Sequence, residues 1–166
     1  MSIKNLSNIE AKHKIKELAE SIDFNLMATD LQNIPLHAIP MSTKKVDEDG
    51  CIWFLSGKDS THNSNIKKDK NIHLFYAKSA AFEFMNVFGH AYIIEDRNII
   101  KDLYQTSDDN WFKGKDDPNL SAIKVEPKDV NYWDTKDGMF ISLLKMGVGA
   151  ITGKKTDLGE EGKLKI

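Results

Sequence analysis

Short strand-like runs joined by tight turns are the feature that most limits the folds open to this chain. Apolar or alternating runs lie at residues 24–31, 34–43, 51–56, 72–77, 82–94, 120–125, 130–133 and 140–144. Most of them are linked by turns rather than helices, whereas a parallel sheet needs a long crossover after nearly every strand. The pattern therefore predicts a mainly β fold, an antiparallel β-barrel decorated with α-helices.

Helical periodicity is confined to a few short segments. The expected helices are residues 8–22, residues 60–69 and a third helix that Asp96 caps. Ser7 and Glu10 have the spacing of a capping box, in which the serine hydroxyl and the glutamate carboxylate each bind the other residue's backbone N–H. These helices are too few to connect a parallel sheet, so they are expected to cover the barrel.

Turn residues fix where the expected strands reverse or bend. Residues 47–50 (Asp-Glu-Asp-Gly) form a turn in which Gly50 tolerates positive φ, so residues 51–56 are expected to return as a hairpin partner. Two prolines in the 34–43 run predict an edge or bulged strand. Gly89 predicts a pivot within the long run that contains it.

Composition places the chain among globular proteins without a strong electrostatic preference. Of its 166 residues, 40% are hydrophobic and 29% charged, and 23 basic residues face 25 acidic ones. This balance gives no reason to expect nucleic-acid binding, and no apolar run has a membrane helix's length. With Cys51 as the only cysteine and no signal-peptide pattern, we expect a cytoplasmic protein. We expect one domain over residues 1–146 and a polar surface tail over residues 147–166.

The segment from residue 52 to residue 62 carries the clearest chemical pattern. An apolar strand-like run ends in a cluster of hydroxyl groups, a lysine and a histidine, and a helix follows. The first N–H groups of a helix lack intrahelical partners and attract anions, so this arrangement is a sensible phosphate cradle. A capped helix after a core strand has the same pattern, and the segment alone does not separate these two readings.

Other common chemistries have no pattern in this sequence. The histidines are scattered without ligand spacing, at positions His13, His37, His62, His73 and His90. There is no nucleophile elbow, no Walker loop and no dinucleotide-binding glycine motif after a strand. The sequence therefore indicates no metal site and no catalytic residue. A phosphate-bearing aromatic cofactor on the outside of the barrel, covered by a partner subunit, is consistent with what is present.

An ordered series of motifs resembles one known family. It consists of Ile39-Pro-Met-Ser-Thr-Lys44, the turn at 47–50, Trp53-Phe-Leu-Ser56, Ser60-Thr-His62, Gly89, Trp111-Phe112, Asp116-Asp-Pro-Asn119, Val125-Glu-Pro127 and Tyr132-Trp-Asp134. The series is similar to the flavin-binding split barrels related to pyridoxamine 5′-phosphate oxidase, and within them to the general stress protein 26 group. The resemblance covers residues 10 to 145 and implies an antiparallel split β-barrel.

The resemblance also implies a homodimer with FMN in clefts between its subunits. By similarity, Pro40 and Met41 lie along the flavin ring, and Lys44 lies near the cofactor and substrate. The other residues implied to bind the cofactor are Trp53, Phe54, Leu55 and Ser56 along the ring and ribityl chain, Ser60, Thr61 and His62 at the phosphate, and Trp133 from the other subunit.

The chain departs from the family pattern at two places. Relatives usually carry arginine where this chain has Ile39, and often lysine or arginine-lysine where it has Thr61 and His62. Charge-assisted hydrogen bonds are roughly twice as strong as neutral ones, so we expect weaker FMN binding. Protonation of His62 below about pH 6.5 is expected to restore part of the charge.

Three functions are consistent with this sequence. The first is a flavin-dependent redox protein that acts on an unknown small molecule, with the chemistry supplied by FMN. The second is a non-catalytic flavin carrier or sensor linked to stress, and the third is a dimeric scaffold without a cofactor. Pyridoxamine-phosphate oxidase activity itself is not expected, because residues 134–166 contain no clear match to that enzyme's basic substrate-binding residues.

Overall fold

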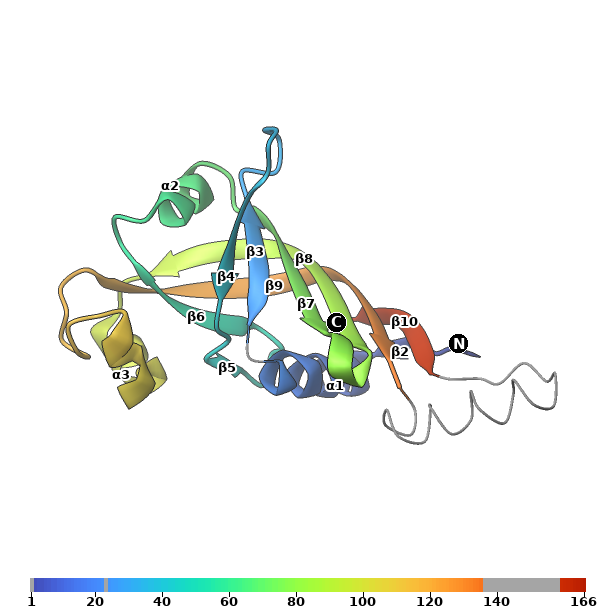
Figure 1. Cartoon of the computed structure of the whole chain (residues 1–166). Coiled ribbons are helices and arrows are strands. Elements are labelled where there is room, and N and C mark those ends of the chain that lie inside the picture. Colours follow the sequence, from blue (N-terminus) through green and yellow to red (C-terminus); the bar gives the residue numbers. More distant parts are fainter. Residues whose placement is uncertain (1, 23, 136–158) are drawn as a thin grey trace.

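The chain forms a ten-stranded, mostly antiparallel sheet with three α-helices, seen in a computed structural model that describes residues 2–22, 24–135 and 159–166 (Figure 1). The strands are β1 (Ser2–Ile3), β2 (Leu6–Ser7), β3 (Asn25–Thr29), β4 (His37–Met41), β5 (Lys45–Val46), β6 (Ile52–Gly57), β7 (Asn71–Lys78), β8 (Glu83–Ile94), β9 (Leu120–Asp134) and β10 (Glu160–Lys165). The helices are α1 (Asn8–Ser21), α2 (Thr61–Lys68) and α3 (Arg97–Leu103), with short 3₁₀ turns η1 (Ser79–Ala81) and η2 (Thr106–Asn110). The three predicted helices and the mainly β character are confirmed.

The long strand β9 organises the sheet because it has three partners. It pairs with β8 along most of its length, with β6 near its beginning and with β10 near its end. The main path of the sheet runs β1-β10-β9-β8-β7-β3-β4. Figure 1 shows β9 as the orange strand that crosses the molecule, with β6 beside one part of it.

A bulge replaces the break that we predicted around Glu126 and Pro127. The two expected strands are one strand, β9, and its register against β8 shifts between Phe88 and Gly89. Pro127 lies opposite Gly89 at this shift. Proline has no N–H to donate, so a bulge lets the strand continue through it. The predicted pivot at Gly89 is confirmed.

The hairpin predicted between the 34–43 run and the 51–56 run is not the pairing in the structure. Strand β4 pairs with β3, which satisfies its backbone groups, and β6 takes the two-residue strand β5 as its hairpin partner. The turn itself is as predicted, since Gly50 has φ of 82° and donates its N–H to the Asp47 carbonyl at 2.9 Å. Strand β4 ends the sheet path, in agreement with the prediction of an edge strand from its prolines.

Both faces of strand β6 are covered by other parts of the protein, so most of its side chains are not free to contact a ligand. Phe54 belongs to the main core, which α1 closes with Ala11, Ile15, Leu18 and Ala19. Trp53 and Leu55 point the other way and pack under α3 with Ile100 and Leu103. Only the end of β6, where the polar residues begin, is left to form a site.

The two ends of the chain form a small sheet extension that the sequence analysis did not predict. Residues 160–165, expected in a surface tail, are strand β10, which pairs with β9 and also with β1 and β2. Ser7 is the N-cap of α1, but its side chain makes no capping hydrogen bond, so the predicted capping box is absent. The strand predicted at 140–144 lies outside the described residues, and the domain division stays a prediction.

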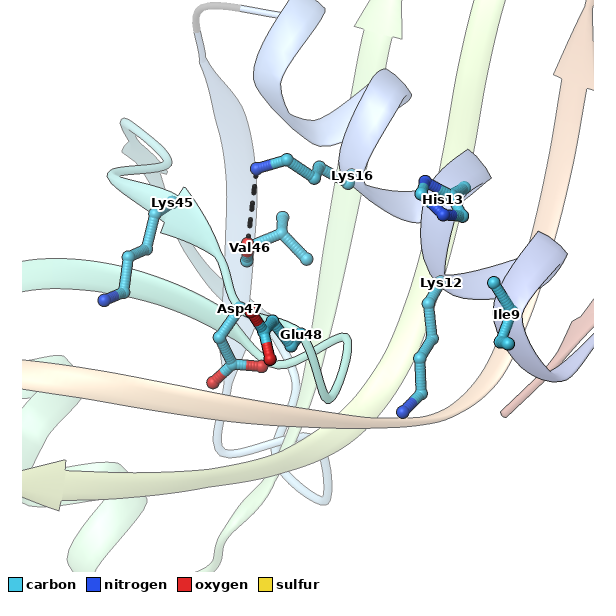
Figure 2. A pocket seen from close by; sticks show the side chains of 8 residues that line it. All are labelled: Ile9, Lys12, His13, Lys16, Lys45, Val46, Asp47 and Glu48. Carbon is cyan, nitrogen blue, oxygen red and sulfur yellow. Dashed lines mark hydrogen bonds between the residues drawn. The ribbon is translucent and has the colours of Figure 1, made fainter.

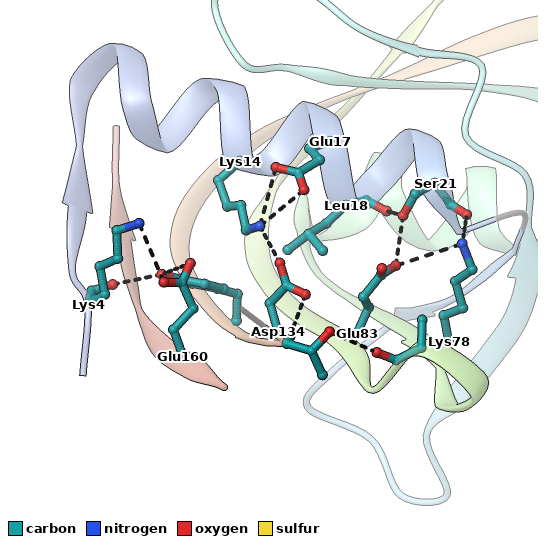
Figure 3. A network of polar contacts seen from close by, with 12 residues as sticks. Lys4, Lys14, Glu17, Leu18, Ser21, Lys78, Glu83, Asp134 and Glu160 are labelled. Carbon is teal, nitrogen blue, oxygen red and sulfur yellow. Dashed lines mark hydrogen bonds and ion pairs between the residues drawn. The ribbon is translucent and has the colours of Figure 1, made fainter. Parts of the chain in front are cut away.

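A network of ion pairs ties α1 to the end of the sheet (Figure 3). Lys14 contacts the carboxylates of both Asp134 and Glu17, and Lys4 pairs with Glu160 at 3.4 Å. Burial lowers the pKa of Lys14, but the Asp134 and Glu17 carboxylates outweigh it and raise that pKa above its usual value. The ammonium therefore stays charged and holds the helix over β9.

The contact at Gly89 makes a first testable prediction. A Cβ atom at this position would lie 2.6 Å from the Glu126 carbonyl oxygen, so Gly89→Ala must displace backbone. We expect a loss of about 1–3 kcal/mol in the free energy of unfolding, measured by urea denaturation. Gly57→Ala is the matched control, because its Cβ would meet only the ends of the Asp59 and Asn119 side chains. Equal losses in the two variants would contradict a special role of the bulge.

Candidate functional site

The predicted strand-to-helix cradle is present where β6 leads into α2. Ser60 is the N-cap of α2, and its hydroxyl accepts a hydrogen bond from the Asn63 N–H at 3.3 Å. Helix α2 has no acidic residue in its first turn and ends with Lys67 and Lys68. Its unpaired N–H groups and its dipole therefore present positive partial charge beside Ser60.

A buried hydrogen-bond network joins this helix to the sheet. The Asn63 amide donates to the Ser121 hydroxyl at 2.9 Å, and that hydroxyl donates to the Ser56 carbonyl at 3.0 Å. The Ser56 hydroxyl donates to Asn63 Oδ1 at 2.9 Å. All three side chains are buried, so each bond is costly to lose. The network fixes α2 relative to β6 and β9.

The same network determines whether His62 Nε2 donates or accepts in its hydrogen bonds. Its Nε2 lies 2.5 Å from the Ser56 hydroxyl oxygen and 3.1 Å from that of Ser60. Because the Ser56 hydrogen is already donated to Asn63, Nε2 must carry a hydrogen and donate it to Ser56. Burial, with a smaller contribution from nearby His37, lowers the pKa of His62 below its usual value of 6.5. The neutral imidazole is therefore favoured, and the protonation expected below about pH 6.5 requires a lower pH than for an ordinary histidine.

A cavity of about 320 Å³ adjoins the cradle. Its lining comes from β4 and the residues after it (Pro40, Met41, Ser42, Lys44), from the end of β6 (Leu55, Ser56, Gly57), from α2 (His62) and from two distant segments (Phe24, Asp108, Trp111, Phe112). The lining combines hydroxyl groups and the start of a helix with apolar and aromatic side chains. This chemistry suits a ligand that carries both an anionic group and a flat apolar part.

Lys44 forms a buried ion pair in the wall of this cavity. Its ammonium lies 2.8 Å from both carboxylate oxygens of Asp108, and the two side chains are only 5% and 12% exposed. The Lys44 N–H donates to the Trp53 carbonyl at 2.8 Å, which fixes the backbone beside β6. The ammonium is therefore already neutralised within the chain.

The structure brings together part of the predicted cofactor site. Six of the predicted residues line the cavity: Pro40, Met41, Lys44, Leu55, Ser56 and His62. Ser60 hydrogen-bonds to two of them, and Thr61 is an exposed residue at the start of α2.

Three predicted residues lie elsewhere. The Phe54 side chain is in the main core, and Trp53 packs under α3 with its Nε1 donating to Asp47 at 2.7 Å. Trp133 is at the far end of β9, paired with Phe84 and Glu161. Since Leu120 at the other end of β9 pairs with Gly57, roughly 40 Å of strand separates Trp133 from the cavity.

Sequence reasoning missed six residues of the lining. Two of them, Ser42 and Gly57, are neighbours of predicted residues in the sequence. Phe24, Asp108, Trp111 and Phe112 come from segments far from the cradle in sequence. Two carry a signal that could have been used, because the Trp111-Phe112 motif is part of the family series and Trp111 is 79% exposed in the structure. A large exposed aromatic side chain beside a cavity often marks a binding surface.

A second, larger cavity of about 580 Å³ lies between α1 and β5 (Figure 2). Its lining contains none of the predicted cofactor residues. Lys16 there bonds to Glu20 at 2.5 Å and to the Val46 carbonyl at 3.4 Å. The Asp47 carboxylate is occupied by the N–H groups of Asp49, Cys51 and Trp53. Its polar groups hold the turn together, so we assign the site to the other cavity.

Two further observations concern the described residues. Over the described residues, no three histidine, cysteine or acidic side chains are grouped in a way that would hold a metal ion. None of the helices seen in residues 2–22, 24–135 and 159–166 has the length and apolar character needed to span a bilayer.

Comparison with solved structures identifies the fold. A putative general stress protein 26 from Jannaschia sp. CCS1 superposes with a TM-score of 0.79 at 19% identity, covering 95% of this chain and 98% of that one. The general stress protein 26 of Bacillus anthracis superposes with a TM-score of 0.64 at 23% identity, covering 73% and 92%. The predicted split-barrel fold is confirmed.

Sequence comparison agrees with this result. General stress protein 26 of Bacillus subtilis is 25% identical over 99 residues, which span 57% of this chain and 71% of that protein. The family model described as "Pyridoxamine 5'-phosphate oxidase like" matches residues 10–157. The predicted relation to the general stress protein 26 group is confirmed by these relatives. The chain belongs to the pyridoxamine 5′-phosphate oxidase-like family.

Proposed function

We propose that this protein binds FMN and uses it for redox chemistry on a small molecule. The observation that carries the proposal is the convergence of β4, the end of β6 and the start of α2 on one cavity. Strand β4 is separate in the sequence from the 52–62 segment that contains the other two, and the family resemblance implied both. A role in the stress response is suggested by the names of the relatives and is part of the proposal.

The chemistry of the donor set fits FMN. The Ser60 hydroxyl and the first N–H groups of α2 suit a phosphate. Asp108 is the only acidic residue among the cavity's described lining residues, and it is paired with Lys44. Met41, Leu55 and Phe112 offer apolar surface for a flat ring. The Ser56 hydroxyl would orient His62, because its own hydrogen is held by Asn63.

When bound, FMN would supply the hydride or electron transfer, which no side chain of the cavity can perform. The residues of this chain would bind and orient it and keep water from one face of the ring. Strand β6 and helix α2 are held by the buried Asn63 network, so the cradle is rigid before any ligand arrives. Rigidity of this kind lowers the entropy lost on binding.

The electrostatics predict weak binding of the phosphate. Lys44 is the only lysine or arginine among the cavity's described lining residues, and Asp108 neutralises it. The lowered pKa of His62 favours its neutral form, which donates one hydrogen to Ser56. The phosphate would thus be held by neutral hydroxyl and N–H donors, which form weaker bonds to anions than cationic donors do.

We also propose a homodimer that covers the open side of the site. Leu26 and Phe75 pair directly across β3 and β7, and both point outward with 50% and 40% exposure. Asn86 pairs with Phe75 on the same face, and its buried Oδ1 has no hydrogen-bond partner among the described residues. An apolar patch beside an unsatisfied polar atom is typical of a surface that another protein covers. A second copy would also bring a Trp133 toward a site that is out of reach within one chain.

The first prediction from this proposal tests FMN binding itself. Titration of purified protein with FMN should give a bound flavin with absorbance near about 450 nm and a higher melting temperature. Ser60→Asp should weaken binding by about a hundredfold, because its carboxylate would repel the phosphate while still capping α2. Ser64→Asp is the control, since this exposed residue lies one turn further along the same helix.

Three outcomes of that titration separate the functions. If the protein takes up no FMN and gains no stability from it, both flavin-dependent functions are ruled out. The dimeric scaffold without a cofactor is then the function that is left. Bound FMN that NADH or NADPH reduces, and that reoxidises faster than free FMN, supports an enzyme. Bound FMN that stays inert supports a carrier or sensor.

The second prediction adds a positive charge beside the proposed phosphate cradle. Thr61→Lys places an ammonium at an exposed position beside the cradle, where relatives often carry a basic residue. We expect FMN affinity to rise about tenfold, and the gain to shrink at high salt. Ser64→Lys adds the same charge one turn away and should give a smaller gain. Equal affinities for wild type and Thr61→Lys would place the phosphate elsewhere.

The third prediction concerns the dimer. Wild-type protein should be dimeric by light scattering at micromolar concentration, and Phe75→Arg should make it monomeric because an unpaired charge would be buried. Its FMN affinity should fall as well, since the site would lose its cover. Ile9→Arg, which changes an exposed residue on α1, should remain dimeric. A monomeric wild type would refute the shared site.

A further inference from the structure

The Lys44–Asp108 ion pair is held more firmly than a surface pair, and neither residue is part of the proposed phosphate cradle. Asp108 accepts the Lys44 ammonium on both oxygens at 2.8 Å and also accepts the Gln105 N–H at 2.8 Å. The Gln105 side-chain oxygen lies 3.4 Å from the same ammonium. With the side chains 5% and 12% exposed, the pair is fixed and poorly hydrated.

The pair also positions the aromatic wall of the cavity. The Asp108 carbonyl accepts the N–H groups of Trp111 at 2.9 Å and Phe112 at 3.0 Å. Lys44 therefore anchors, through Asp108, the segment that carries both aromatic side chains. The position of Lys44 relative to the cradle follows from strand β6. The Lys44 backbone bonds to Trp53, and the cradle begins at Ser56 on the same strand. Trp53 and Ser56 are three residues apart, which is about 10 Å along a strand.

Lys44 and Asp108 line the same cavity that adjoins the cradle, and the Lys44 backbone lies about 10 Å along β6 from Ser56. A ligand with its phosphate at Ser60 would extend its flat ring toward Lys44, Asp108 and Phe112. Two-electron reduction of FMN with uptake of one proton leaves one extra negative charge on the ring. A fixed charge beside the ring therefore changes the relative affinity for the two oxidation states.

We propose that Asp108 is a positioning residue that neutralises Lys44 and so keeps the reduction potential of the bound FMN low. This inference rests on the proposed function. Without the carboxylate, the Lys44 ammonium would attract the charge that reduction adds and would favour the reduced state. With it, the ring end of the cavity carries no net charge from this pair.

The test measures the midpoint potential of FMN bound to each variant, by reductive titration with dithionite against a reference dye. Asp108→Asn should tighten binding of reduced over oxidised FMN about tenfold, which is a rise of about 30 mV for two electrons. The double variant Lys44→Gln with Asp108→Asn removes both charges and should return to the wild-type potential. A merely structural role of Asp108 would not produce that return.

Two exposed residues complete the experiment. Gln105→Glu adds a carboxylate near the same ammonium and should lower the potential. This variant does not break the pair, so it serves if Asp108→Asn fails to fold. Asp109→Asn is the control, because that carboxylate binds the Tyr104 hydroxyl at 2.6 Å and should leave the potential unchanged.

The outcomes separate this inference from the function on which it rests. If wild-type protein binds FMN and neither Asp108→Asn nor Gln105→Glu moves the potential, the inference is wrong and the proposed function stands. If wild-type protein takes up no FMN, both are wrong. If the midpoint potential rises in Asp108→Asn and stays raised in the double variant, the electrostatic role of Asp108 is also refuted.

Discussion

The backbone pairing of β9 with three other strands is the constraint on which the rest of this structure depends. One strand can serve β6, β8 and β10 only if it is long and changes partner along its length. The bulge opposite Gly89 makes this possible, because it bends β9 without ending its ladder. Both the core under α1 and the second cluster under α3 form against strands that β9 holds in place.

The site inherits its rigidity from that arrangement. Ser121 on β9 and Ser56 on β6 lie opposite each other, and Asn63 joins both to α2 through buried hydrogen bonds. Removing any one partner would leave a buried polar group unsatisfied, so the helix cannot drift from the strand at low cost. The cradle is thus a consequence of the sheet pairing as well as of the local strand-to-helix sequence.

Charge in the site is decided by neighbours that are remote in the sequence. Lys44 looks like a free cation in the sequence. In the structure, however, its ammonium donates to both carboxylate oxygens of Asp108, which lies 64 residues later. His62 looks like a group that protonates near pH 6.5, yet its burial and the nearby His37 lower its pKa. In both cases the residue type was visible and its electrical state was not, because that state depends on solvent access and on contacts across the fold.

The sequence by itself determined the mainly β class, the three helices, the turn at Gly50, the pivot at Gly89 and the hydroxyl cradle, because each depends on residues close together in the chain. Only the tertiary structure decided that β9 runs unbroken through Pro127, that residues 160–165 join the sheet, and that Asp108, Trp111 and Phe112 reach the cavity. These features depend on contacts between distant segments, which satisfy backbone groups or bury side chains in ways that local periodicity does not encode.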